Sequence, residues 1–387
     1  MTASVEKSVW RDRAERRLEE LADCSFENFR QIHAAPFRPL RFGAAGIAYA
    51  FWKAACVLES AEWLNCARLW LELTLAGPED TDRAVMPGGE EFTLNVRDSF
   101  FDGNRGVWFV QSLIGFAEEN PRLTRKGLEA FTAPAATTEE MQEILQGIGG
   151  RLLGCAILIK ESSLWRTVIP DNIDLHAYGT NLADELCRTA FKSDDWERPW
   201  QDNLYLGMAH GRAGPYYALL RWAKETGWRP PNWLHQALLH YATLATPQEH
   251  GIRWGAHEHR PEAHMNSWCN GAPGQIHLYS LAYDIYRDER FLITARESAD
   301  YCLHEKMHSH GHICCGAAGA AYALLALDRI DPGQSWRQHA FRYAETAYEG
   351  IAVARWRLSL YNGLAGVICL MLDMDDPDHA AQPLIEG

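Results

Sequence analysis

Residues 316–328 read GAAGAAYALLALD, which is a pair of glycines three positions apart followed at once by an apolar run. The same element occurs seven times, and successive first glycines lie 44 to 64 residues apart. The pairs are Gly43 and Gly46, Gly103 and Gly106, Gly147 and Gly150, Gly211 and Gly214, Gly271 and Gly274, Gly316 and Gly319, and Gly363 and Gly366. One such pair carries little weight, but seven at this period indicate a repeat architecture.

The apolar run of each repeat predicts a buried helix. It is apolar on more than one face, so it must be covered on several sides. Between the runs lie amphipathic stretches, such as residues 288–306 and 336–354, with apolar residues three and four apart and a charged opposite face. The period therefore accommodates two helices per repeat, one buried and one facing outward. We expect the glycines where a loop enters the buried helix, because backbones approach closely there or because φ is positive.

These helix pairs predict an all-α fold, a double-layered α/α toroid of seven helical hairpins and about fourteen helices. A linear solenoid would need polar caps at its ends. A closed ring needs none, and it buries its inner helices all round. We expect a single domain over residues 1–387, in which residues 1–35 form an N-terminal helical extension.

The charge and hydropathy of the chain exclude several classes. The formal net charge of −14 argues against nucleic acid and anionic membrane as main partners. No run of eighteen apolar residues predicts a membrane span, and the charged N-terminal segment lacks the apolar centre of a secretory signal. We therefore expect a cytoplasmic protein whose ten cysteines are free thiols, metal ligands or catalytic groups rather than disulfides.

Reactive side chains occur in three consecutive glycine elements, the fourth to the sixth. His210 directly precedes the fourth pair, Cys269 lies two positions before the fifth, and Cys314 and Cys315 precede the sixth. Equivalent positions of a ring point to the same end, so these side chains should converge on one central site. Three thiolates beside an open position are a ligand set typical of catalytic zinc. The spacing alone leaves buried thiols as an equal alternative.

Histidines near the cysteine pair leave the ligand set open. Four of them precede it, and any could replace a cysteine on the metal, although such a run is more often a solvated loop. They are His304, His308, His310 and His312.

Three motifs together resemble the lanthionine synthetase C-like cyclase family: AHG at residues 209–211, WCNGAPG at 268–274 and CCGAAG at 314–319. The resemblance extends from about residue 40 to about residue 370. It implies an α/α toroid with a central zinc ion. It also implies formation of thioether rings by addition of a cysteine thiol to a dehydroalanine or dehydrobutyrine of a peptide. Since the chain has no room for a dehydratase, a separate dehydratase would have to supply the dehydrated precursor peptide.

The resemblance also implies roles for particular residues. Cys269, Cys314 and Cys315 match the zinc-ligand positions, and His210 matches the proposed acid/base histidine. The third ligand is usually histidine in free-standing cyclases, and Cys315 is typical of a subgroup of bifunctional synthetases. Glu143 stands where the family often has aspartate, and we expect it to orient His210 or to share its proton.

Two positions depart from the family pattern. Many members have arginine where this chain has Met265, and tyrosine or histidine where it has Asn270. These departures leave the zinc ligands intact. They concern proton transfer and the natural substrate.

Three other functions remain compatible with the sequence. The same zinc chemistry could add glutathione or another small thiol to a dehydrated protein. A toroidal binding or scaffold protein with structural zinc would provide a fourth protein ligand. A carbohydrate-active toroid would need paired carboxylates. Asp98, Asp102 and Glu143 precede glycine elements, but carboxylates there are usually helix caps, and that class does not explain the cysteines.

Overall fold

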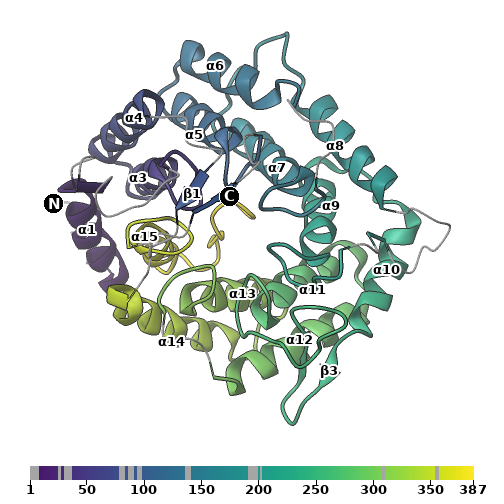
Figure 1. Ribbon diagram of the computed structural model, residues 1–387. Coiled ribbons are helices and arrows are strands. Elements are labelled where there is room, and N and C mark those ends of the chain that lie inside the picture. Colours follow the sequence, from purple (N-terminus) through teal and green to yellow (C-terminus); the bar gives the residue numbers. More distant parts are fainter. Residues whose placement is uncertain are drawn as a thin grey trace.

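The protein is a ring of two concentric layers of helices, viewed along its axis in Figure 1. The computed structural model describes residues 8–24, 28–29, 37–77, 83–85, 91–93, 98–135, 141–190, 199–200, 203–306, 310–353 and 357–387. Within these residues there are fourteen α-helices, seven in each layer. The predicted all-α toroid of seven helical hairpins is therefore confirmed.

The inner layer consists of the helices that follow the glycine pairs. They are α3 (Ala44–Leu58), α5 (Asn104–Ala117), α7 (Ile148–Leu164), α9 (Ala213–Thr226), α11 (Ala272–Tyr286), α13 (Ala317–Ile330) and α15 (Leu364–Asp373). Each packs against the next, and α15 packs against α3, which closes the ring. Inner helices are buried almost all round, as α13 shows from Ala317 to Asp328.

The outer layer covers this ring. Its helices are α1 (Val9–Ala22), α4 (Ala61–Ala76), α6 (Pro121–Thr132), α8 (Leu175–Thr189), α10 (Asn232–Ala242), α12 (Glu289–His304) and α14 (Trp336–Glu349). Outer helices bury only one face, and in α14 that face is Ala340, Ala344 and Ala347. The outer neighbour of α15 is α1, from the other end of the chain. The assignment of residues 1–35 as an extension of a single domain stays a prediction.

Short elements complete the described structure. The 3₁₀ helix η1 (Gly350–Val353) follows α14. Two antiparallel hairpins pair β1 (Arg83–Val85) with β2 (Glu91–Thr93), and β3 (Thr246–Pro247) with β4 (Ile252–Arg253). Within the described part of the chain, no helix combines the length and the apolarity that crossing a bilayer requires.

The glycine pairs serve close packing rather than positive φ. The first glycine caps six of the seven inner helices, with φ between −103° and −158° in extended backbone. The expectation of positive φ was therefore wrong at these junctions. A Cβ on the second glycine of any pair would collide with the carbonyl oxygen six positions earlier, as at Gly319 with Ile313. The entering loop thus lies directly on the first turn of its helix.

Replacing Gly319 by alanine should destabilise the fold by about 3 kcal/mol, the upper end for overpacking, because the backbone of Ile313 cannot move aside. Gly227→Ala is the matched control, since Gly227 has φ +72° and nothing within 4 Å of an added Cβ. That change should cost only about 1 kcal/mol of backbone strain. Urea unfolding measures both values. Equal losses in the two variants would contradict close packing as the reason for the repeat.

The last residues of the chain occupy the centre of the ring (Figure 1). Tyr361 donates to the carbonyl oxygen of Pro383 at 2.7 Å, and Arg329 binds the Glu386 carboxylate at 2.6 Å. Lys160 and Arg221, late in their inner helices, donate to the Glu386 carbonyl oxygen at 2.9 and 2.6 Å. This segment therefore packs toward the C-terminal ends of the inner helices, and the opposite end carries the junction loops.

Candidate metal and catalytic site

A belt of backbone hydrogen bonds joins successive junction loops. We call junction belt the residues two positions before each first glycine: Arg41, Phe101, Leu145, Ala209, Cys269, Cys314 and Tyr361. The N–H group of one belt residue donates to the carbonyl oxygen of the next: Ala209 to Cys269 at 3.0 Å, Cys269 to Cys314 at 3.2 Å, Cys314 to Tyr361 at 2.9 Å, Tyr361 to Arg41 at 3.1 Å and Arg41 to Phe101 at 3.0 Å. The belt holds Cys269 and Cys314 in register on adjacent loops.

The three predicted cysteines meet at this belt. The Sγ atom of Cys315 lies 3.4 Å from that of Cys269 and 3.5 Å from that of Cys314. Cys269 and Cys314 are buried, and Cys315 is partly exposed. All three remain free thiols, and together they form a group able to hold a metal ion. The structure thus brings together the three cysteines that the sequence analysis singled out.

Mutual contact makes one of these thiols acidic. Hydrogen bonds from Cys314 and then Cys315 lower the pKa of Cys269 well below its usual range, against the opposing effect of burial. The contact with Cys269 in turn raises the pKa of both partners. The group therefore gives up its first proton readily and shares a negative charge that suits a cation.

The described histidines near the cysteine pair lie outside the three-cysteine group. Nδ1 of His312 accepts the backbone N–H of Cys315 at 3.2 Å, so this ring supports the loop. His310 stacks on His312 with 5.3 Å between ring centroids. His304 groups instead with His250 and Asp300. Among the described residues, no histidine belongs to the three-cysteine group. His308 lies outside the described residues.

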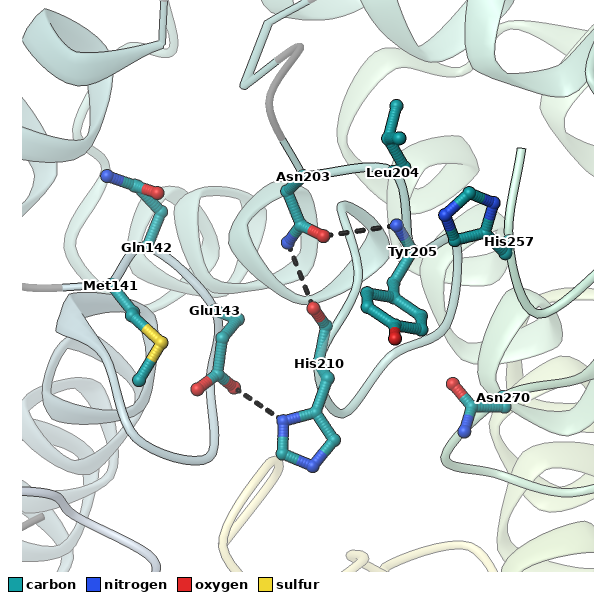
Figure 2. Close-up of a pocket in the computed structure, with 9 residues that line it drawn as sticks. All are labelled: Met141, Gln142, Glu143, Asn203, Leu204, Tyr205, His210, His257 and Asn270. Atoms are coloured by element: carbon teal, nitrogen blue, oxygen red, sulfur yellow. Dashed lines mark hydrogen bonds and ion pairs between the residues drawn. The ribbon is translucent and has the colours of Figure 1, made fainter. Parts of the chain in front are cut away.

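A pocket lined by Asn270, the neighbour of Cys269 in the chain, opens where the belt is interrupted. The Leu145 N–H donates to Oε2 of Glu143 at 2.6 Å, and the Leu145 carbonyl accepts the Ser99 hydroxyl at 2.5 Å, so both groups are taken from the belt. The pocket has a volume of about 620 Å³. Figure 2 shows its lining: Met141, Gln142, Glu143, Asn203, Leu204, Tyr205, His210, His257 and Asn270.

Glu143 and His210 face each other in this pocket (Figure 2). Oε2 of Glu143 lies 3.8 Å from Nδ1 of His210, and the side chain of Glu143 is 4% exposed whereas that of His210 is 46% exposed. Asn203 supports the histidine loop by donating to the carbonyl oxygen of His210 at 2.9 Å. The pair thus joins a buried carboxyl group to an imidazole that substrate can reach.

Burial moves the two pKa values toward an uncharged pair. It raises the pKa of Glu143 to about 8, although the N–H groups of Leu145 and Gln146 hydrogen-bond the carboxylate. Burial, and then the charge of Arg41, lowers the pKa of His210. Near neutral pH, Glu143 therefore holds a proton and His210 has a free nitrogen to receive one.

The raised pKa of Glu143 predicts a pH-dependent stability of the metal-free protein. Folding takes up a proton between the ordinary pKa of 4.5 and the folded value of about 8. The free energy of unfolding should therefore fall as pH rises through this window and level off above it. At about 1.4 kcal/mol per pKa unit, the loss is on the order of 5 kcal/mol. Urea unfolding of the protein and of Glu143→Gln across this range should show a steeper decline in the former, and parallel curves would contradict it.

Sequence reasoning missed an arginine–aspartate pair on the belt. The Asp102 carboxylate accepts hydrogen bonds from Nε and Nη2 of Arg41 at 2.6 and 2.5 Å. Asp102 is therefore not the helix cap that its position suggests, and the N-cap of α5, Gly103, makes no side-chain cap bond. The available signal was the position of Arg41, which is equivalent to Cys269 and Cys314.

The two departing positions differ in their relation to the pocket. Asn270 lines it, and its buried Oδ1 has no hydrogen-bond partner among the described residues. Met265 is partly buried and does not line it, and its carbonyl oxygen packs against Gly271. Asn270 is thus the one of the two that can contact a substrate.

Comparison with known proteins assigns the chain to one family. The model of the family "Lanthionine synthetase C-like protein" matches residues 40–386, and the chain therefore belongs to this family. It is similar to Glutathione S-transferase LANCL1 of Danio rerio, with 28% identity over 193 residues. This match covers 48% of the chain and 47% of the relative, so the chain spans about half the length of that protein.

A solved structure, that of nisin cyclase, is also similar to the chain. The TM-score is 0.67, with 15% sequence identity and 95% of each chain covered. At this identity the likeness shows a shared fold, the toroid described above.

Proposed function

We propose that this protein is a zinc-dependent lanthipeptide cyclase. It forms lanthionine and methyllanthionine thioethers by adding a cysteine thiolate to dehydroalanine or dehydrobutyrine in a dehydrated precursor peptide. The observation that supports this most is the three-cysteine group beside a proton-holding carboxyl and a reachable imidazole. Membership of the family and a fold shared with nisin cyclase support it further.

The residues present fit a zinc ion held by Cys269, Cys314 and Cys315. Zinc–thiolate bonds of about 2.3 Å in tetrahedral geometry place sulfurs about 3.8 Å apart. The sulfur–sulfur distances of 3.4 and 3.5 Å need only a small outward movement. When bound, zinc lowers the pKa of a thiol so that it reacts as thiolate near neutral pH. Three ligands from the described chain leave one position for the substrate sulfur, whereas a structural site would be closed.

The chain's own residues account for proton delivery. The thiolate forms a bond to the β-carbon, and the electron pair of the double bond moves to the α-carbon and its carbonyl oxygen. His210, half-exposed in the pocket, protonates the α-carbon and takes its proton from the Glu143 carboxyl group. The proton that the substrate thiol released restores Glu143, so the cycle closes without a further reagent.

The direct test supplies the zinc-loaded protein with a peptide that contains one dehydroalanine and one cysteine. The expected product has unchanged mass, no longer reacts with iodoacetamide, and shows a thioether ring on fragmentation. A separate dehydratase is the partner that would prepare such a peptide. A peptide that keeps its free thiol at the rate seen without protein would reject the cyclase.

A second candidate is addition of a small thiol, and the similarity to Glutathione S-transferase LANCL1 favours it. The same assay distinguishes the two. With glutathione present, a gain of one glutathione mass with the peptide cysteine still free would indicate thiol addition. Ring closure that free glutathione does not change supports the cyclase. Neither product, with zinc firmly bound, would favour a toroidal binding or scaffold protein.

A further inference from the structure

Arg41 is held rigidly with one edge left open. Its Nε and Nη2 atoms are bound by Asp102, and its guanidinium carbon lies 4.0 Å from the ring centroid of Phe42. The side chain is only 13% exposed, and that of Asp102 is fully buried. Nη1 makes no hydrogen bond to any described residue. A buried cation costs free energy that a fixed carboxylate offsets, so the pair holds a guanidinium edge ready for another group.

The position of Arg41 in the ring places it across from the proton donor. Tyr361 separates it from Cys314 along the junction belt, while Cys269 separates Cys314 from Ala209, which precedes His210. The cysteines therefore have the histidine loop on one side and the arginine loop on the other. The charge of Arg41 also acts on the proton-donor half of the site, because it opposes the rise in the pKa of Glu143 and adds to the fall in the pKa of His210.

The proposed reaction needs a positively charged hydrogen-bond donor near the carbonyl oxygen of the dehydrated residue. As sulfur adds to the β-carbon, negative charge develops on the carbonyl oxygen of the dehydrated residue. His210 serves the α-carbon, and Glu143 is its proton source, so neither neutralises that oxygen. Preorganised donors aimed at a developing oxyanion are among the largest contributions to catalysis.

We propose that Arg41 is a further catalytic residue, whose Nη1 donates to the carbonyl oxygen of the dehydrated residue and stabilises the enolate. Asp102 is its positioning residue. When the α-carbon receives its proton, the carbon–oxygen double bond reforms and Arg41 releases the oxygen. This inference rests on the proposed function.

Three variants test the assignment. Arg41→Met should keep full zinc content and an unchanged KM and lower kcat about 10²–10³-fold, as for loss of one oxyanion donor. Arg41→Lys keeps the charge without the two-point contact to Asp102 and should recover part of the rate. The kcat of Asp102→Asn should lie between those of Arg41→Met and Arg41→Lys. The matched control is Arg105→Met, which removes another buried arginine paired with an aspartate, Asp98, one repeat away.

A binding measurement separates this inference from the proposed function. The probe is a short peptide that ends in an alanine carboxylate, compared with its C-terminal amide, on the metal-free protein. The unmodified protein and Arg105→Met should bind the carboxylate at least tenfold more tightly, and Arg41→Met should lose that preference. A preference retained in Arg41→Met, or a kcat within threefold of normal at full zinc, would overturn the assignment. Absence of ring closure in the unmodified protein would instead reject the cyclase.

Discussion

Replacing Cys315 by alanine should release the zinc ion and reduce thioether formation to the rate of the peptide alone. Two sulfurs would remain, and the sulfur removed lies 3.4 and 3.5 Å from them. Metal analysis after gel filtration measures the zinc, and iodoacetamide labelling of the peptide measures ring closure. The fully buried Cys302, in the outer helix α12, is the matched control, and Cys302→Ala should keep both.

A second substitution at the same position tests the ligand role itself. Cys315→His replaces a thiolate with a neutral nitrogen ligand that zinc also accepts. It should restore zinc binding and give slower ring closure, because less negative charge reaches the substrate sulfur. Full zinc occupancy in Cys315→Ala would show that the ligand assignment is wrong.

His210→Asn should leave zinc bound and slow ring closure about 10²–10⁴-fold, the usual contribution of a general acid. Asparagine keeps a polar side chain but cannot carry the proton from Glu143 to the α-carbon. Single-turnover rates with saturating peptide measure the chemical step. His257→Asn changes another histidine of the same pocket and should stay close to the normal rate. An unchanged rate in His210→Asn would remove this residue from the mechanism.

The pH profile gives a further signature of the same pair. Delivery of a proton requires Glu143 in its protonated form, and its pKa is about 8. The rate should therefore hold below that pH and fall above it, and Glu143→Gln should be slow and lack this alkaline decline. The same decline in both proteins would assign the titration to another group.

The fold could be predicted from the sequence because its main requirement is local. The second glycine of each pair must lack a Cβ, since the carbonyl oxygen six positions earlier occupies that place. Because this requirement occurs seven times, it appears in the sequence as a repeated glycine motif. The reason for it was less visible, because composition does not distinguish close packing from positive φ.

Site residues at equivalent positions of the repeat could be predicted from the sequence. Contacts between residues of different repeats at unequal positions could not. Cys269 and Cys314 occupy equivalent positions, and their meeting follows from the ring. The contact of Arg41 with Asp102 joins residues 61 positions apart, and the position of Arg41 in the repeat does not indicate Asp102 as its partner. The pocket was hidden for a similar reason, since it depends on Glu143 taking the N–H of Leu145 out of the belt.

Closure of the ring has a consequence for how the protein is made. A ribosome releases Arg41 early and Cys314 late, yet the Cys314 N–H acquires its partner only when Tyr361 emerges, and Tyr361 in turn binds Arg41. The three thiols therefore stay unassembled through most of translation. A nascent chain that stalls before residue 361 has its cysteines but lacks the Tyr361 carbonyl that fixes Cys314, so we expect the proposed reaction only from a finished ring.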